Sequence, residues 1–191
     1  ISTKESVEII RKAKKDGLPI TCDTAPPYFM LNELSLENYR TFSKLSPPLR
    51  TEEDRNNIIN GILDGTIDVI ASDHTPHDQD AKRLPFNQAE FGGVGLETLL
   101  PMTLNLVKNN NLSLTKAISL ITKNPSEILG LKTGKISPDS EADLMVFDLE
   151  KPWKINSENF HSKSKNSPFD GILVQGKNLM TFVRGRLVYK S

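Results

Sequence analysis

The 191-residue sequence has a single cysteine, no excess of one charge and no long apolar run. Cys22 has no partner for a disulfide among these residues, which is the usage expected in the cytoplasm. No apolar stretch reaches the roughly 18 residues that a membrane span requires. The 24 basic and 24 acidic residues balance, which argues against nucleic acid or an anionic membrane as the main partner. Small molecules and proteins remain as expected partners.

The composition is that of a globular protein. Hydrophobic residues make up 37% and charged residues 25%, enough for a buried core, and no internal repeat or low-complexity tract is present. The length suits one domain, or one large domain with an appendage. Because the chain opens with Ile1 and lacks the pattern of a signal peptide, we expect it to be a piece of a longer protein.

The first part of the sequence alternates between helical and strand patterns. Apolar residues at helical spacing predict a helix over residues 4–16, and the apolar run 18–22 predicts a strand directly after it. Pro26–Pro27 then breaks the chain into a long irregular stretch. A capping-box pattern at residues 51–54 predicts a second helix, which ends at Gly65.

The same alternation continues through the middle of the chain. The β-branched residues 67–72 predict a second strand, and after a loop over 73–95 the apolar spacing predicts a helix over 96–107. The resulting order of helix, strand, helix, strand and helix is typical of a parallel α/β sheet.

The C-terminal third has a different character. Two shorter helices are predicted, one capped by Ser113 and one opened by Asn124–Pro125, before short β-type segments take over. We therefore expect a main domain over residues 1–132 and a small β appendage over 133–191. The β-type segments are 143–147, 171–175 and 179–189, with a tight hairpin at 183–186.

The strongest candidate for chemistry is the run Asp73-His74-Thr75-Pro76-His77, directly after the second predicted strand. One carboxylate and two imidazoles suit metal ligation or proton transfer. The alternative is that Asp73 caps a turn while the histidines are ordinary polar loop residues. The position at the C-terminal end of a strand favours function, because parallel α/β folds place reactive groups there.

Two further segments are weaker candidates by themselves. The glycines of Phe91–Gly95 run into a helix and could let backbone N–H groups approach a ligand, but they fit a plain turn equally well. Arg50, at the end of the irregular stretch, could bind a carboxylate with two hydrogen bonds, although an arginine before a helix is more often solvated.

Taken together, three motifs resemble the dihydroorotase family of the amidohydrolase superfamily in order and spacing. They are LSPPLR at residues 45–50, IDVIASDHTPH at 67–77 and FGGVGLET at 91–98. The resemblance extends into the tail, at residues 134–136, 141–144 and 183–186.

The resemblance implies a fold and an activity. The expected fold is α/β: the C-terminal part of a (β/α)8 barrel of a metallo-dependent hydrolase, followed by a small β segment of the amidohydrolase composite domain. The expected reaction is the reversible hydrolysis of dihydroorotate to carbamoyl-aspartate in pyrimidine biosynthesis. A barrel of this kind needs about 250 residues, so the remainder of the barrel would be supplied from upstream of this chain.

The resemblance also implies roles for particular residues. Asp73 would contact a pair of zinc ions and act as the base, whereas His77, Gly92 and Ser46 would face the substrate. Ser46 stands where relatives usually carry Asn, and residues 25–28 lack a His-His pair that many relatives have. The other metal ligands would lie upstream, so we expect the isolated chain to be inactive.

Two alternatives stay open. A related cyclic-amide hydrolase, such as an allantoinase or a dihydropyrimidinase, would share the barrel, the metal and the aspartate. A non-catalytic dihydroorotase-like subunit would instead scaffold aspartate transcarbamoylase, although the presence of Asp73 and His77 argues against a pure scaffold. A homodimer is a further expected assembly.

Overall fold

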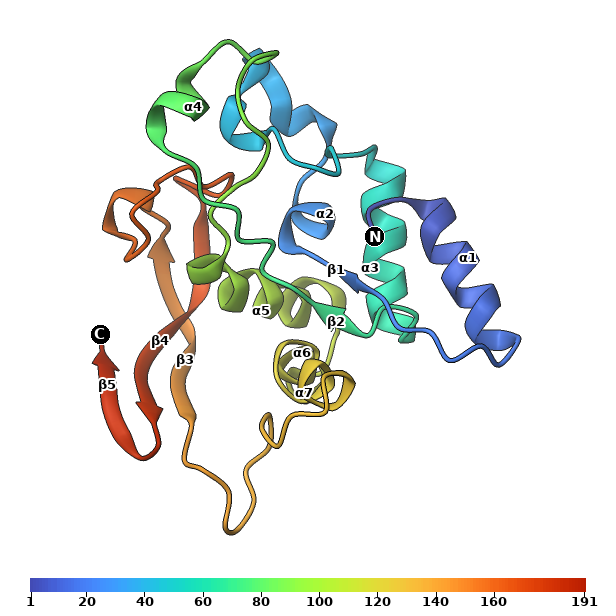
Figure 1. Cartoon of the computed structure of the whole chain (residues 1–191), viewed down its shortest axis with the longest axis vertical. Coiled ribbons are helices and arrows are strands. Elements are labelled where there is room, and N and C mark those ends of the chain that lie inside the picture. The colour runs from blue at the N-terminus through green and yellow to red at the C-terminus, as the bar shows by residue number, and fades with distance from the viewer. The chain divides into compact units, whose positions relative to one another are not determined.

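The computed structural model describes residues 1–191, which form two compact units (Figure 1). The first unit consists of residues 1–99 and 155–172, and the second of residues 100–154 and 173–191. The predicted boundary between residues 132 and 133 falls within the second unit and stays a prediction. None of the helices is both long and apolar enough to cross a lipid bilayer.

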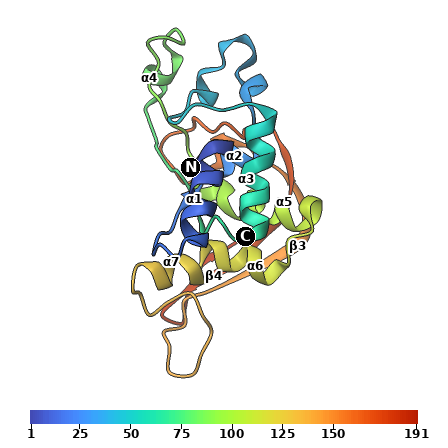
Figure 2. The same ribbon diagram turned by 90° about the vertical axis from the view of Figure 1, so that its right-hand side faces the viewer.

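Two neighbouring helices, both predicted, form one side of the first unit. Helix α1 (Lys4–Lys15) runs beside α3 (Glu52–Asp64) in both views (Figures 1 and 2). Helix α3 begins with a capping box at Thr51 and ends at Gly65 in a left-handed conformation. The helices approach closely because Gly61 has no side chain: a Cβ there would lie 3.1 Å from Val7, which is fully buried.

The first unit contains a parallel pair of short strands, as the alternation of elements predicts. Strand β1 (Asp23–Thr24) pairs in register with β2 (Val69–Ile70), which is the core of the second predicted strand. The strand predicted over 18–22 is wrong, because the paired strand consists of Asp23 and Thr24. Pro19 lacks an N–H, Leu18 is 54% exposed, and these residues pack little apolar surface.

Two short helices were not predicted. The prolines at 26–27 occupy the first turn of α2 (Pro26–Met30), where a missing N–H costs nothing, so they begin a helix and do not break one. Helix α4 (Gln79–Arg83) lies inside the predicted loop and is capped by Asp78. Short 3-10 segments occupy Thr41–Ser43, Leu96–Thr98 and Ser157–Asn159, and a longer one, Glu33–Tyr39, is interrupted by a kink at Glu37 and Asn38.

The second unit combines three helices with an antiparallel sheet in the order β3-β4-β5, whose strands overlap the β-type segments predicted at 143–147, 171–175 and 179–189. Arg184 and Gly185 both have positive φ and form the predicted hairpin turn between β4 and β5. The elements are α5 (Leu99–Asn110), α6 (Leu114–Ile121), α7 (Lys123–Ile128), β3 (Leu144–Lys154), β4 (Leu173–Val183) and β5 (Arg186–Lys190) (Figure 1).

The first turn of α3 generates a prediction about pH. Hydrogen bonds from Arg55 and then from Asn32 lower the pKa of Glu52 from 4.5 to about 2. Because the folded-state pKa lies below the unfolded one, Glu52 stabilises the fold above about pH 4.5 and this contribution is lost as the pH falls through about 2. We expect Glu52→Gln to melt at a lower temperature at neutral pH, and the difference to disappear at about pH 2.

Thermal unfolding followed by circular dichroism across this pH range measures the effect. Glu5→Gln, at an exposed position of α1, is the control for the same chemical change. If the melting temperature of Glu52→Gln stays below that of the native protein by the same amount down to about pH 2, the lowered pKa of Glu52 does not contribute to stability as proposed.

Candidate functional site

Asp73 follows β2 closely and has an unusual backbone. Its φ is 47°, in the left-handed region that residues other than glycine seldom adopt, and its side chain is half-buried. Burial, and then the charge of Asp23, raise the pKa of the Asp73 carboxyl, whereas the charge of the Ile1 ammonium group, and then the Tyr28 hydroxyl, oppose the rise. The carboxylate takes part in none of the chain's ion pairs. Asp73 is therefore a partly buried carboxylate without a cation at ion-pair distance.

Tyr28 is the aromatic neighbour of this carboxylate. The ring is buried in α2, and the hydroxyl donates a hydrogen bond to the carbonyl of Pro47 at 2.9 Å. Burial and the charge of Asp73 raise the pKa of Tyr28, so the hydroxyl keeps its proton. The single hydroxyl proton can go either to the Pro47 carbonyl or to the Asp73 carboxylate, so Tyr28 is a neutral polar neighbour of Asp73. The sequence does not indicate this contact, because the two residues are 45 positions apart.

Gly95 allows the chain to return against the end of β2. A Cβ at Gly95 would lie 2.1 Å from the Ser72 carbonyl oxygen, a distance that no side chain tolerates. The amide of Gly95 donates to His74 Nδ1 at 3.2 Å, so a neutral His74 ring carries its proton on Nε2. Residues 73–75 and 93–95 are further connected by a β-bridge between His74 and Gly93 and by a 2.9 Å hydrogen bond from the Thr75 amide to the Gly93 carbonyl. We call this pairing of the two segments the join.

Gly92 lies next to this join, and its backbone polar groups are already bonded. Its amide donates to the Lys44 carbonyl at 2.9 Å, and its carbonyl accepts from Lys82 Nζ at 2.9 Å and from Asn166 at 3.3 Å. Its φ is 124°, and a Cβ would lie 2.7 Å from the side chain of Thr75. The predicted substrate contact at Gly92 stays a prediction; glycine is required here by the close approach of Thr75.

The other predicted residues occupy loops around Asp73. His77 is half-buried and its amide donates to Asn166 Oδ1 at 3.4 Å, whereas the Ser46 side chain is exposed next to a cis Ser46–Pro47 bond. Arg50 has a buried Nε with no hydrogen-bond partner. Asp73 lines a small cavity that His77, Ser46 and Gly92 do not line, together with Pro27, Leu45, Ser72, Gly93, Val94, Gly95, Pro168 and Phe169.

These residues do not build a metal centre by themselves. No three or more His, Cys, Asp or Glu side chains come together in a way that could hold a metal ion. A half-buried carboxylate without an ion pair fits one position in the ligand set of a cation, but a stable site needs several more ligands.

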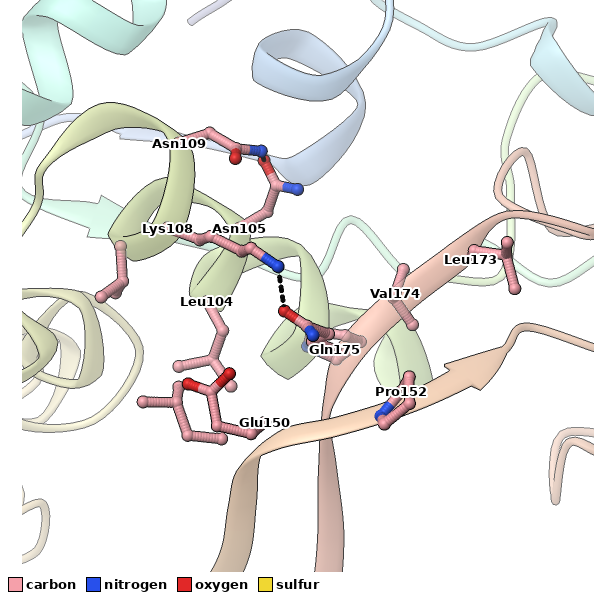
Figure 3. Close-up of a pocket in the computed structure, with 12 residues that line it drawn as sticks. Leu104, Asn105, Lys108, Asn109, Glu150, Pro152, Leu173, Val174 and Gln175 are labelled. Carbon is pink, nitrogen blue, oxygen red and sulfur yellow. Dashed lines mark hydrogen bonds between the residues drawn. The ribbon is translucent and has the colours of Figure 1, made fainter.

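The second unit contains a separate hollow between α5 and the β3-β4 ribbon (Figure 3). Lys108 on α5 donates a hydrogen bond to the Gln175 side chain on β4, and Asn105, Asn109 and Glu150 supply the other polar groups. None of the predicted site residues lines this hollow, so the sequence motifs direct attention to Asp73 instead.

Comparisons with known proteins support a single family. A family model described as "Amidohydrolase family" matches residues 1–188. Proteins named dihydroorotase from Anaplasma phagocytophilum (strain HZ) and Ehrlichia chaffeensis are 50% and 44% identical over 191 residues, and the chain covers 43% of each. The chain thus spans less than half the length of these curated relatives.

Solved structures share the fold. L-Hydantoinase (dihydropyrimidinase) from Arthrobacter aurescens matches 100% of this chain and 44% of its own, with a TM-score of 0.92 and 32% identity. The dihydropyrimidinase from Brevibacillus agri NCHU1002 also matches 100% of this chain, 43% of its own, with a TM-score of 0.92, but at 24% identity it supports the fold alone.

Gly95 provides a test of how the site is built. We expect Gly95→Ala to lower the free energy of unfolding by about 3 kcal/mol, because the new methyl group collides with the Ser72 carbonyl. Gly17→Ala is the matched control: a Cβ there meets nothing within 4 Å, so only its left-handed backbone costs about 1 kcal/mol. Urea unfolding measures both values, and equal losses would contradict the steric role of Gly95.

Proposed function

Because the chain belongs to the amidohydrolase family, we propose that it is part of a dihydroorotase, which reversibly hydrolyses dihydroorotate to carbamoyl-aspartate in pyrimidine biosynthesis. The observation that carries the proposal is the 50% identity, along all 191 residues, to a protein named dihydroorotase. The local structure supports it, because a half-buried carboxylate follows a parallel strand at the position where such folds place a reactive group.

In the proposed reaction Asp73 moves a proton. Its carboxylate accepts a proton from the attacking water, whose oxygen bonds to the ring amide carbon. The proton then passes to the amide nitrogen as the carbon–nitrogen bond breaks, which restores the Asp73 carboxylate. The second proton of the water stays on the new carboxyl group, which releases it near neutral pH. Burial raises the pKa of Asp73, which makes its carboxylate a stronger base. The rigid join at Gly95 fixes the Asp73 backbone for this task.

We further propose that the metal is zinc, two ions in a complete site, with Asp73 as one ligand. Bound zinc would act as a Lewis acid on the amide carbonyl and would lower the pKa of a water toward about 7. The remaining ligands, and the rest of the barrel, would come from residues outside these 191. The partly buried, unpaired charge of Asp73 supports this role, since such an anion is stabilised by a cation.

Substrate contacts are assigned to His77, Gly92 and Ser46 as part of the same proposal. Ser46 has an exposed hydroxyl that can donate one hydrogen bond to the ring or its carboxylate. The buried and unpartnered Nε of Arg50 provides a further donor for a carboxylate. Gly92 would contribute its Cα surface, since its backbone polar groups are bonded within the chain.

A second candidate is the hydrolysis of another cyclic amide, such as a hydantoin or a dihydropyrimidine. The 32% identity and 0.92 TM-score to L-hydantoinase favour it. Dihydroorotate carries a carboxylate that unsubstituted dihydrouracil lacks, so rates with these two substrates separate the candidates. A clear preference for dihydrouracil would overturn the dihydroorotase assignment.

For partners, we propose a homodimer or a complex with aspartate transcarbamoylase, formed by the full-length protein. Light scattering of the full-length protein alone, and after mixing with aspartate transcarbamoylase, measures both assemblies. A monomer under both conditions would overturn this part of the proposal.

Asp73→Asn tests the proposed base. In the full-length protein we expect kcat for dihydroorotate hydrolysis to fall about 10³-fold or more, because an amide cannot accept the proton. Asp78→Asn is the matched control in the same loop, since asparagine also caps α4. Unchanged kcat in Asp73→Asn, with a circular dichroism spectrum like that of the native protein, would refute the assignment.

A further inference from the structure

Two lysine side chains are buried in the first unit. Lys82 is 0% exposed and Lys44 is 7% exposed, although lysine is almost never fully buried unless its charge is paired. Neither ammonium group takes part in an ion pair. Their burial therefore has to be compensated by other groups.

Backbone carbonyl oxygens provide that compensation. Lys44 Nζ donates to the carbonyls of Phe86 at 2.7 Å, Asn87 at 3.4 Å and Ala89 at 2.5 Å. An ammonium group has three N–H donors, so these three acceptors match it in number. The same ammonium lies 4.4 Å from the centre of the Phe91 ring, a favourable cation–π distance.

Lys82 binds backbone carbonyls in the same way, further along the segment of residues 86–92. Its Nζ donates to the carbonyls of Glu90 at 2.8 Å, Gly92 at 2.9 Å and Lys44 at 3.4 Å. The two ammonium groups thus bind five carbonyls within residues 86–92, and the Lys44 carbonyl connects the two lysines. We call Lys44, Lys82 and these carbonyls the lysine clamp.

The lysine clamp connects directly to the candidate site. The Lys44 carbonyl also accepts from the Gly92 amide, and Gly92 lies against Thr75, two residues after Asp73. Asn166 shares the Gly92 carbonyl with Lys82 and also accepts from the His77 amide. Displacement of Gly92 would therefore move the loop that carries Asp73 and His77.

We infer that Lys44 and Lys82 are positioning residues, whose ammonium groups hold residues 86–92 as a fixed wall against the Asp73–His77 loop. The inference deepens the proposed function, on which its kinetic test rests. Residues 86–92 form no helix or strand, so their carbonyl oxygens have no ladder of amides to accept from, and the two cations donate to five of them. This explains why charged side chains are retained in the interior.

The test uses Lys82→Met in the full-length protein, because methionine keeps much of the apolar length and removes the charge and three hydrogen bonds. We expect amide exchange of residues 75–92 to rise about tenfold or more, and KM for dihydroorotate to rise about tenfold while kcat also falls. Lost folding stability alone would reduce the amount of active enzyme and leave KM unchanged. Lys15→Met, exposed on α1, is the control and should match the native protein.

Lys44→Met provides an independent variant with the same expected changes. Native exchange rates and native KM in both variants would overturn the inference. If neither variant folds, exchange of the native protein decides: exchange of residues 86–92 as fast as that of an exposed loop would overturn the clamp, and strong protection would support it. If the native protein hydrolyses no dihydroorotate, the proposed function fails, whereas the exchange comparison still tests the clamp.

Discussion

The return of the chain at Gly95 against the Ser72 carbonyl is the constraint on which the site depends. Only a residue without a Cβ can approach this carbonyl, and the approach brings residues 93–95 alongside the end of β2. Once the two segments are joined, His74 and Thr75 have fixed hydrogen-bond partners. Asp73 can then keep its left-handed backbone, because the structure on both sides of it is determined.

The buried lysines and Asp73 near this join differ in how their charges are stabilised. The ammonium groups of Lys44 and Lys82 each donate to backbone carbonyls of residues 86–92, so their hydrogen-bond donors are satisfied although neither charge is paired with an anion. The Asp73 carboxylate has a raised pKa, Tyr28 as a polar neighbour and no cation at ion-pair distance. A rigid surround with one unmatched anion is the arrangement expected of a group that works on a substrate or a metal.

Local sequence signals predicted the elements that depend on local interactions. Helix caps and turns depend on residues only a few positions apart. The sequence patterns therefore predicted the caps and glycines around α1 and α3 and the Arg184–Gly185 turn. The strand at 18–22 was misplaced because an apolar run does not say where a partner strand will pair. For α2, proline was taken as a break, although the same residue suits a first helical turn.

The candidate site could be predicted only in part, because some of its contacts join residues that are far apart in the sequence. The position of Asp73 after a strand is a local signal, and the three motifs agreed on it. Tyr28 and Asn166 contribute through contacts across 45 and 74 residues of sequence, and the lysine clamp depends on where carbonyls converge. The spacing of residues in the sequence does not indicate which distant carbonyls will lie close together. Nor does the sequence distinguish a buried lysine from a solvent-exposed one.

The division of the first unit into residues 1–99 and 155–172 has a consequence for biosynthesis. Asn166 binds Gly92 and the His77 amide across 74 and 89 residues of sequence, with most of the second unit encoded between them. During translation the ribosome releases the Asp73 loop long before Asn166 exists, so the loop is first made without this support. These two hydrogen bonds can therefore form only after residue 166 has been synthesised, and a nascent chain that ends before it lacks both.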